Sequence, residues 1–142
     1  MSKVIVLGGG MVGSAMAIDM VKNHDVLLTD ICGQVLDSTK EKCSELDIMV
    51  LDVTNEQLLM KTITSFDLVI SAVPGFLGYR TLENIIKAEV NVVDISFFPE
   101  NSLDLDDRAK ANGVTAIVDC GVAPGMDNVI LGYYNEKYKL TD

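Results

Sequence analysis

The sequence predicts an α/β fold, a doubly wound parallel sheet of six strands in the order 3-2-1-4-5-6, with helices on both faces. Six short apolar runs alternate with helix-like segments, and this alternation is typical of parallel strands joined by right-handed crossovers. A glycine-rich turn joins the first strand to the first helix. The 142 residues, 49% of them hydrophobic, suit one globular domain with one sizeable core.

The first strand, Val4–Leu7, runs into a turn with the pattern G-x-G-x-x-G, followed by a helix-like segment. This order indicates a Rossmann dinucleotide site. The first glycine permits a tight turn, the second leaves room for a pyrophosphate, and the third lets the helix pack closely on the strand. The helix N-terminus then offers unpaired N–H groups to the phosphates. The predicted cofactor contacts in this turn are Gly8, Gly10, Met11, Val12 and Gly13.

The second strand, Val26–Thr29, ends at Asp30, 20 positions after Gly10. That spacing fits the carboxylate that binds the adenosine ribose. A carboxylate there accepts hydrogen bonds from both ribose hydroxyls and repels a 2′-phosphate, and the next residue is Ile31, not arginine. We therefore predict NAD rather than NADP as cofactor. The alternative is an ordinary acidic loop residue.

The third strand, Ile48–Leu51, is followed by Asp52 and Val53. Because adenine lies at the carboxyl ends of strands in this fold, Asp52 is a candidate acceptor for the adenine amino group. It can equally cap the following helix. Thr54, with Gln57 three residues later, predicts the capping box of that helix.

The fourth strand, Asp67–Val73, is predicted to lie beside the first, across the crevice in which ligands bind. Its small, uncharged end would let the cofactor lie against the backbone. The residues concerned are Ala72, Val73 and Pro74.

The rest of the chain continues the alternation. Gly75 and Gly78 predict a flexible loop. The later elements are predicted as a helix over Tyr79–Ala88, a strand over Asn91–Ile95, a loop over Ser96–Asn101, a helix over Leu103–Asn112, a strand over Val114–Val118, a loop over Asp119–Gly125 and a helix over Met126–Leu140.

Charge and cysteine usage exclude several classes of function. The net charge is −10 with no basic block, which argues against nucleic acid or an anionic membrane as partner. No apolar run approaches the roughly 18–20 residues of a membrane span, and the chain enters a strand at once, so we expect no signal peptide and a cytoplasmic protein. Cys32, Cys43 and Cys120 are widely spaced without a CxxC pair, which predicts reduced thiols and no metal site.

The later part of the chain closely resembles the saccharopine dehydrogenase-like family, which includes saccharopine reductases, lysine 6-dehydrogenases and carboxynorspermidine dehydrogenases. Val93–Ser96 matches its V-D-x-S pattern, and Asp119–Gly125, followed by Asn128, matches its D-x-G-x-x-P-G pattern. The resemblance spans the whole chain and identifies it as an N-terminal nucleotide-binding domain.

The resemblance implies an amino-acid dehydrogenase that moves hydride between a nicotinamide cofactor and a C–N bond. Its small-molecule substrate would be a lysine-derived amine or imine. Relatives often carry alanine at the position of Cys120, so this thiol is not predicted to be a nucleophile. They usually continue into a substrate-binding and dimerising domain, so a homodimer is expected for a full-length relative and this chain would be its cofactor domain.

No catalytic residue can be assigned from the sequence. The only histidine, His24, is predicted to lie in a surface turn away from the cofactor. Ser96 is expected to contact the nicotinamide ribose or carboxamide, whereas Asp94 and Asp119 can equally be caps, and Asn128 is a further candidate at this edge. We therefore expect the proton-transfer groups to lie outside this chain, which would bind NAD without turnover.

Two alternatives remain at this stage. One is a nucleotide-sensing regulatory module of a potassium channel or transporter, which has a similar length, glycine turn and acidic residue. The Asp119–Gly125 segment disfavours it, because such modules do not need that segment. The other is a scaffold that binds no nucleotide, which the intact glycine turn and Asp30 disfavour.

Overall fold

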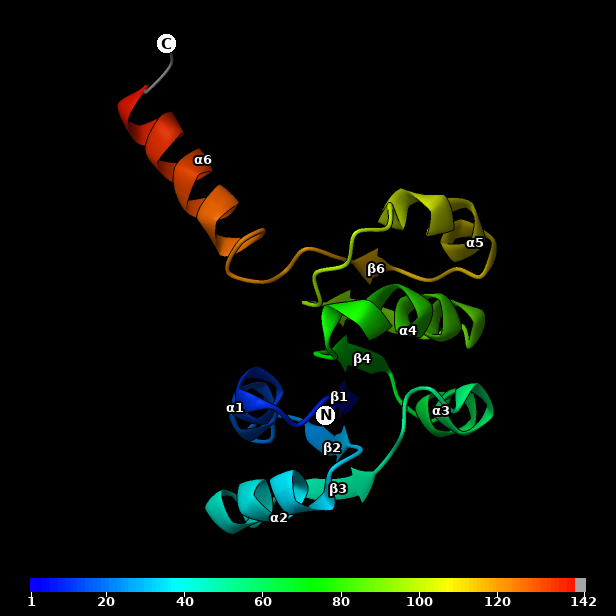
Figure 1. Cartoon of the computed structure of the whole chain (residues 1–142). Coiled ribbons are helices and arrows are strands. Elements are labelled where there is room, and N and C mark those ends of the chain that lie inside the picture. The colour runs from blue at the N-terminus through cyan, green and yellow to red at the C-terminus, as the bar shows by residue number, and fades with distance from the viewer. Residues whose placement is uncertain (140–142) are drawn as a thin grey trace.

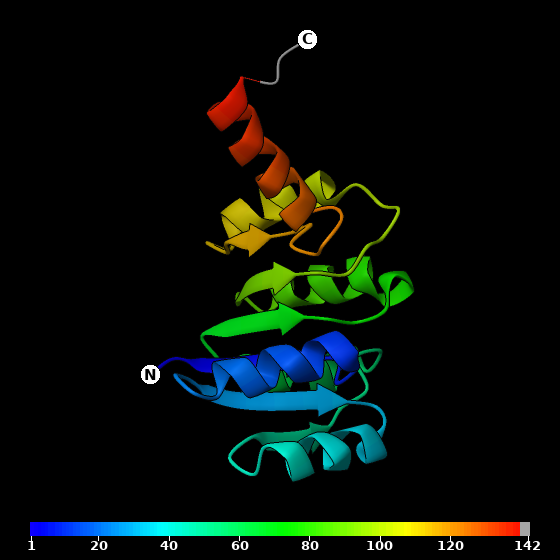
Figure 2. The ribbon, with the colours of Figure 1, turned by 90° about the vertical axis from the view of Figure 1, so that its left-hand side faces the viewer.

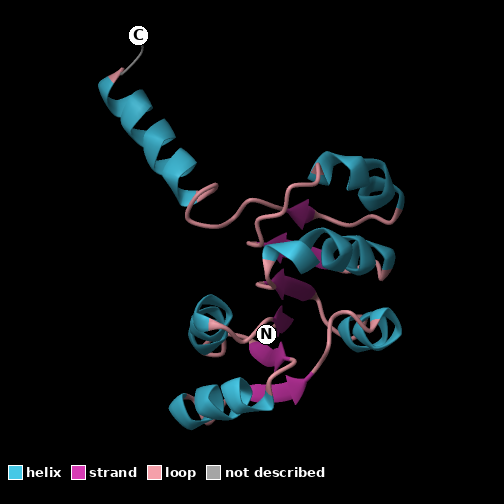
Figure 3. Ribbon diagram, viewed as in Figure 1, coloured by secondary structure: helices cyan, strands magenta, loops and turns pink. Residues whose placement is uncertain are grey.

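The computed structural model describes residues 1–139 and has the predicted architecture. Six parallel strands form one sheet in the order β3-β2-β1-β4-β5-β6 (Figures 1 and 3). The bounds of the elements are β1 Lys3–Leu7, α1 Met11–Met20, β2 Asp25–Asp30, α2 Gly33–Lys42, β3 Asp47–Val50, α3 Glu56–Ile63, β4 Leu68–Ser71, α4 Gly75–Lys87, β5 Asn91–Asp94, the 3₁₀ helix η1 Ser102–Leu105, α5 Asp106–Ala111, β6 Ala116–Ile117 and α6 Met126–Tyr138.

Helices cover both faces of the sheet (Figure 1): α1 and α2 lie on one face, and α3, α4 and α5 lie on the other. Side chains of a strand alternate between the two faces, so each face has its own apolar core. On β1, Val4 and Val6 belong to the core under α1 and α2, whereas Ile5 and Leu7 belong to the larger core under α3, α4 and α5. The sheet is therefore buried on both faces, which explains why its strands read as continuous apolar runs.

The two elements before the last helix are shorter than predicted. The sixth strand contains only Ala116–Ile117, because β6 pairs with β5 through two residues at the edge of the sheet. The helix predicted over Leu103–Asn112 is a 3₁₀ turn, η1, followed by the six-residue helix α5. At the carboxyl edge, β4 ends at Ser71 and β5 at Asp94, so both strands also end one or two residues earlier than predicted.

The prediction of a flexible loop at Gly75 and Gly78 is wrong, because both glycines belong to α4. A Cβ atom at Gly75 would lie 2.0 Å from the carbonyl oxygen of Phe97, and one at Gly78 would lie 2.6 Å from Ser96 Oγ. Here glycine serves close packing between α4 and the segment after β5, not mobility.

The predicted capping box of α3 is also wrong by one residue. The N-cap is Asn55, whose side-chain oxygen accepts a hydrogen bond from the Leu58 amide at 3.1 Å. Thr54 instead donates to Asp52, through its amide at 2.9 Å and its hydroxyl at 2.7 Å. The turn between β3 and α3 is thus fixed by Asp52.

The last helix, α6, extends away from the layered body (Figures 1 and 2). It begins at Met126 as predicted, and Leu140, the predicted end, lies outside the described residues. None of its residues is buried, and its large apolar side chains are exposed. Among residues 1–139, no helix combines the length and apolarity that a bilayer span requires.

Candidate dinucleotide site

The glycine turn follows β1 at the carboxyl edge of the sheet, and two of its glycines are required by close contacts. Gly8 has a φ of +100°, which favours glycine, and a Cβ there would lie 2.5 Å from the carbonyl oxygen of Ala72. A Cβ at Gly13 would lie only 1.8 Å from the carbonyl oxygen of Gly8. The turn and the first turn of α1 therefore pack directly on each other and on the exit of β4.

Gly10 differs from its neighbours because it faces open space. A Cβ atom there would meet no atom within 4 Å. Gly10 is the N-cap of α1, and the first turn of that helix contains no acidic side chain. Within residues 1–139, the amides of Gly10, Met11 and Val12 have no hydrogen-bond acceptor. An open helix N-terminus of this kind suits an anionic group.

The Asp30 carboxylate, at the end of β2, is held against this turn. Its Oδ2 accepts a hydrogen bond from the Gly9 amide at 2.7 Å, and its Oδ1 accepts one from the Cys32 amide at 2.8 Å. Each carboxylate oxygen keeps a lone pair free after these bonds. Asp30 can therefore still accept hydrogen bonds from the two hydroxyls of a ribose.

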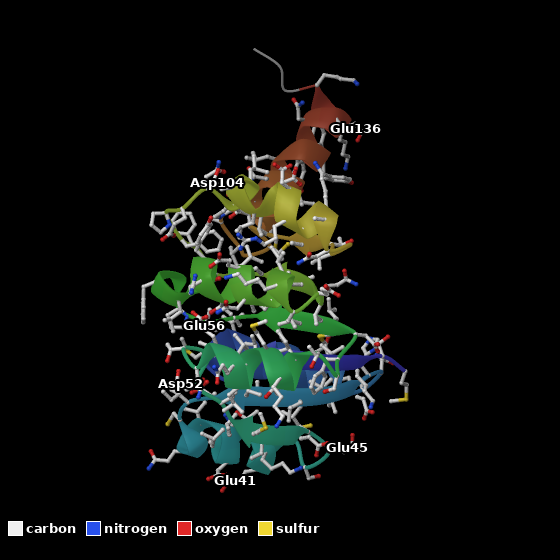
Figure 4. The ribbon with its side chains drawn as sticks, turned by 90° about the vertical axis from the view of Figure 1, so that its right-hand side faces the viewer. Glu41, Glu45, Asp52, Glu56, Asp104 and Glu136 are labelled. Carbon is white, nitrogen blue, oxygen red and sulfur yellow. The ribbon has the colours of Figure 1, made fainter. Side chains whose placement is uncertain are left out.

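Asp52 forms the next part of the same edge. Figure 4 places it at one margin of the sheet, with Glu45 toward the opposite margin. Its Oδ1 accepts the hydroxyl and amide hydrogens of Thr54, and these bonds lower the pKa of the carboxyl. Asp52 thus shapes the turn before α3, and the prediction that it can cap this helix is wrong, because the N-cap is Asn55.

A cleft of about 400 Å³ lies between the ends of β1, β2, β3 and β4. Its walls are mostly apolar, with Asp30, Asp52 and Thr54 as the polar groups, and these described lining residues include no lysine or arginine. The lining residues are Gly8, Asp30, Ile31, Leu51, Asp52, Val53, Thr54, Val73, Pro74, Phe76 and Leu77. Such a slot, apolar with a few polar groups at its edge, suits an adenosine.

The structure brings most of the predicted site residues together. Seven of them line the cleft: Gly8, Asp30, Ile31, Asp52, Val53, Val73 and Pro74. Gly10, Met11 and Val12 form the adjoining helix start, and Gly13 and Ala72 pack behind the turn. Ser96, predicted to contact the nicotinamide ribose or carboxamide, does not line this cleft; it is 7% exposed, and its hydroxyl donates to Asp94.

Sequence reasoning missed four residues of the cleft. Phe76 and Leu77 lie in the first turn of α4, which was predicted to be a loop, and Phe76 is 85% exposed. Leu51 and Thr54 flank Asp52 and were interpreted only as strand and cap residues. The available signal was position, because residues just after a strand of this fold line the ligand crevice.

The other candidate residues lie elsewhere. His24 is half-buried between α1 and β2, at the opposite edge of the sheet. Asp119, Cys120 and Asn128 are exposed and line a separate hollow of about 580 Å³ at the start of α6. Cys32, Cys43 and Cys120 are free. The described residues contain no cluster of three His, Cys, Asp or Glu side chains able to hold a metal ion.

Comparison with known proteins identifies the family of this chain. The family described as "Saccharopine dehydrogenase NADP binding domain" matches residues 4–117. The chain is 26% identical over 127 residues to the saccharopine dehydrogenase [NADP(+), L-glutamate-forming] of Saccharomyces cerevisiae, covering 89% of this chain and 28% of that protein. It is 27% identical over 131 residues to the mitochondrial alpha-aminoadipic semialdehyde synthase of Rattus norvegicus, covering 90% and 14% respectively.

A solved structure agrees with this match. The apo saccharopine dehydrogenase (L-Glu forming) from Saccharomyces cerevisiae superposes with a TM-score of 0.83 at 24% identity, over 96% of this chain and 31% of that chain. This chain therefore spans less than a third of the length of these relatives. The relatives give no support to a potassium channel module. By the match over residues 4–117, the chain belongs to the saccharopine dehydrogenase NADP binding domain family.

Proposed function

We propose that this chain binds a nicotinamide adenine dinucleotide across the carboxyl edge of its sheet, with the pyrophosphate on the start of α1. One observation carries the proposal: unpaired amides surround a helix start at which Gly10 leaves open space. Asp30 lies beside it with free lone pairs for the ribose, and the cleft beyond it suits the adenine. The cofactor, when bound, supplies the hydride chemistry.

The proposed cofactor is NAD rather than NADP. The family description and the yeast relative's name both specify NADP, so this choice rests on the residues of this chain. The Asp30 carboxylate is fixed where the ribose 2′ position is expected, Asp52 adds a second negative charge, and the lining residues of the cleft include no cation. A 2′-phosphate placed there would be repelled by both carboxylates.

We further propose that the chain is the cofactor domain of an oxidoreductase acting on the C–N bond of a lysine-derived amino acid. Substrate binding, proton transfer and homodimer formation are assigned to parts of such a protein outside residues 1–142. The exposed apolar side chains of α6, among them Val129, Leu131 and Tyr133, suit contact with a further domain. A cytoplasmic location fits the three free cysteines.

Calorimetric titration of NADH and NADPH into this chain tests the proposal. We expect NADH to bind at a single site and more tightly than NADPH. Saturable binding of neither dinucleotide would overturn the proposal, and tighter binding of NADPH would overturn the choice of NAD. Incubation with NAD and lysine or saccharopine is expected to produce no NADH from this chain alone.

A further inference from the structure

A group of buried polar side chains lies where β4 and β5 end. Ser71 and Asp94 are paired residues of these neighbouring strands, and both are fully buried. Ser96, two residues after Asp94, is 7% exposed. Burying a carboxyl group costs free energy unless hydrogen bonds compensate for the lost hydration. The buried position of Asp94 therefore needs a physical explanation.

Hydrogen bonds connect Asp94 to the segment that follows β5. Its Oδ1 accepts from the Ser96 amide at 2.6 Å and also from the Ser96 hydroxyl. The backbone carbonyl of Asp94 accepts from the Cys120 amide at 3.3 Å, on the segment after β6. Asp94 Oδ2 and the hydroxyl of Ser71 lie beside each other without a well-formed partner in the described chain. The side chain of Asp94 thus holds the segment after β5, and its backbone carbonyl holds the segment after β6.

The same segment is pressed against the beginning of α4. The close approaches of Gly75 to Phe97 O and of Gly78 to Ser96 Oγ leave no room for a side chain at either glycine. Phe98 adds an edge-to-face contact with Tyr79, with ring centroids 5.8 Å apart. The backbone of residues 95–98 is therefore held by the hydrogen bonds of Asp94 to Ser96 and by close packing against α4.

We propose that Asp94 and Ser96 are positioning residues that fix residues 95–98 at the nicotinamide end of the site. This inference rests on the proposed function. In this fold the dinucleotide crosses the sheet at the switch point between β1 and β4, so its nicotinamide half lies on the side of β4 and β5 when its adenosine lies over β2 and β3. Asp94 and Ser96 act through the backbone, since both side chains are buried beneath it.

The test compares two ligands that differ only at the nicotinamide end. NADH and ADP-ribose share adenosine, pyrophosphate and the second ribose, so the ratio of their dissociation constants isolates the nicotinamide contribution. We expect Ser96→Ala and Asp94→Ala to raise the Kd of NADH relative to that of ADP-ribose by roughly 3- to 10-fold, the effect of one or two lost hydrogen bonds. Ser96→Ala adds no volume, so it decides the outcome if Asp94→Ala does not fold.

Asn112→Ala is the matched control. The Asn112 side chain donates a hydrogen bond to the carbonyl of Ile86 at 2.8 Å, at the amino edge of the sheet. Its loss is expected to lower the melting temperature and leave the ratio unchanged. A ratio that stays at the wild-type value in Ser96→Ala, or that shifts equally in Asn112→Ala, would overturn the positioning role. If the wild-type chain bound neither NADH nor ADP-ribose, the proposed function itself would be overturned.

Discussion

The amide of Gly9 donates a hydrogen bond of 2.7 Å to the carboxylate of Asp30, 21 positions later in the chain. This bond ties the end of β2 to the turn that follows β1. The Gly9 amide is therefore not one of the unpaired amides at the start of α1. The same hydrogen bond holds the Asp30 carboxylate at the border of the cleft. In the proposed site, Asp30 would therefore couple the recognition of the phosphates to that of the ribose.

Asp30→Asn should weaken NADH binding more than NADPH binding. The substitution removes the negative charge that favours two ribose hydroxyls and opposes a 2′-phosphate, while an amide oxygen can still accept one backbone hydrogen. We expect NADH affinity to fall roughly tenfold, as for a lost charge-assisted hydrogen bond, and the preference for NADH over NADPH to narrow. Calorimetry measures both.

Asp37→Asn is the control for Asp30→Asn, because it removes the same charge from an exposed position on α2. Its affinities for both dinucleotides should match those of the wild type. Equal losses for NADH and NADPH in Asp30→Asn would show that Asp30 acts only as a support for the turn.

Two glycine substitutions should separate folding from binding. Gly10→Ala has an allowed φ of −62° and open space for its methyl group, so its stability should lie within about 1 kcal/mol of the wild type. The methyl group would occupy the expected place of the pyrophosphate, and NADH affinity should fall roughly tenfold or more, about 1.4 kcal/mol. Gly13→Ala should instead destabilise the fold by about 1–3 kcal/mol or more, because its Cβ would meet Gly8 O.

Urea denaturation and NADH titration measure the two effects separately. The contrast between the variants is the critical result. If Gly10→Ala bound NADH as well as the wild type does, the helix start would not be the pyrophosphate site.

The sequence predicts those parts of the candidate site in which local geometry requires one particular residue type. Gly8 is required by its positive φ and Gly13 by its contact with Gly8 O, and Asp30 follows at a spacing set by one helix and one strand, α1 and β2. These constraints are local in the chain, so a pattern reveals them.

The errors arose where individual side-chain contacts decide the local structure, because a sequence motif does not show these contacts. The prediction of a flexible loop at Gly75 and Gly78 is wrong because glycine is needed there for close contact with Phe97 and Ser96. These two residues lie about 20 positions later in the sequence, so the local pattern does not reveal the contact. The hydroxyl of Ser96 donates to Asp94, so the contact predicted between this side chain and the nicotinamide half stays a prediction for its backbone. Thr54 and Asn55 are both good N-cap residues, and the hydrogen bonds of Thr54 to Asp52 leave Asn55 as the cap.

The free energy of unfolding of the Asp94→Asn variant should increase relative to that of the wild type as the pH rises. Burial raises the pKa of Asp94 above its ordinary value of 3.8, assisted by the negative charge of Asp119 and opposed by the hydrogen bonds from Ser96 and by the neighbouring hydroxyl of Ser71. A folded-state pKa above the unfolded one means that the wild type loses stability as pH rises above about 4. Asparagine does not ionise, so the variant does not lose stability in this way. Its side-chain NH₂ group can donate to Ser71 while its oxygen accepts from Ser96.

Urea denaturation of Asp94→Asn and the wild type at pH 4 and pH 8 checks this prediction. The difference in unfolding free energy between the two proteins should be larger at pH 8. A difference that is the same at both pH values would mean that Asp94 titrates alike in the folded and unfolded states.

Glu83 should contribute stability at neutral pH that disappears in acid. Its side chain, 15% exposed on α4, contacts Arg80, Lys87 at 3.1 Å and Arg108 at 2.7 Å. The hydrogen bond from Arg108 is the largest cause that lowers the pKa of Glu83, from 4.5 to about 2, against the opposing effect of burial. Because the folded-state pKa is depressed, the contribution is complete above about pH 5 and is lost as pH falls toward 2.

Glu83→Gln should therefore lower the free energy of unfolding by about 1–2 kcal/mol at pH 7, a value reduced by solvent screening because Arg80 and Arg108 are about half exposed. The deficit should shrink progressively between pH 5 and pH 2 and should also shrink in 1 M salt. Glu45→Gln, an exposed position before β3 (Figure 4), is the matched control and should change stability little at any pH. A deficit of Glu83→Gln that persisted unchanged at pH 2 would assign the role of Glu83 to packing rather than to its charge.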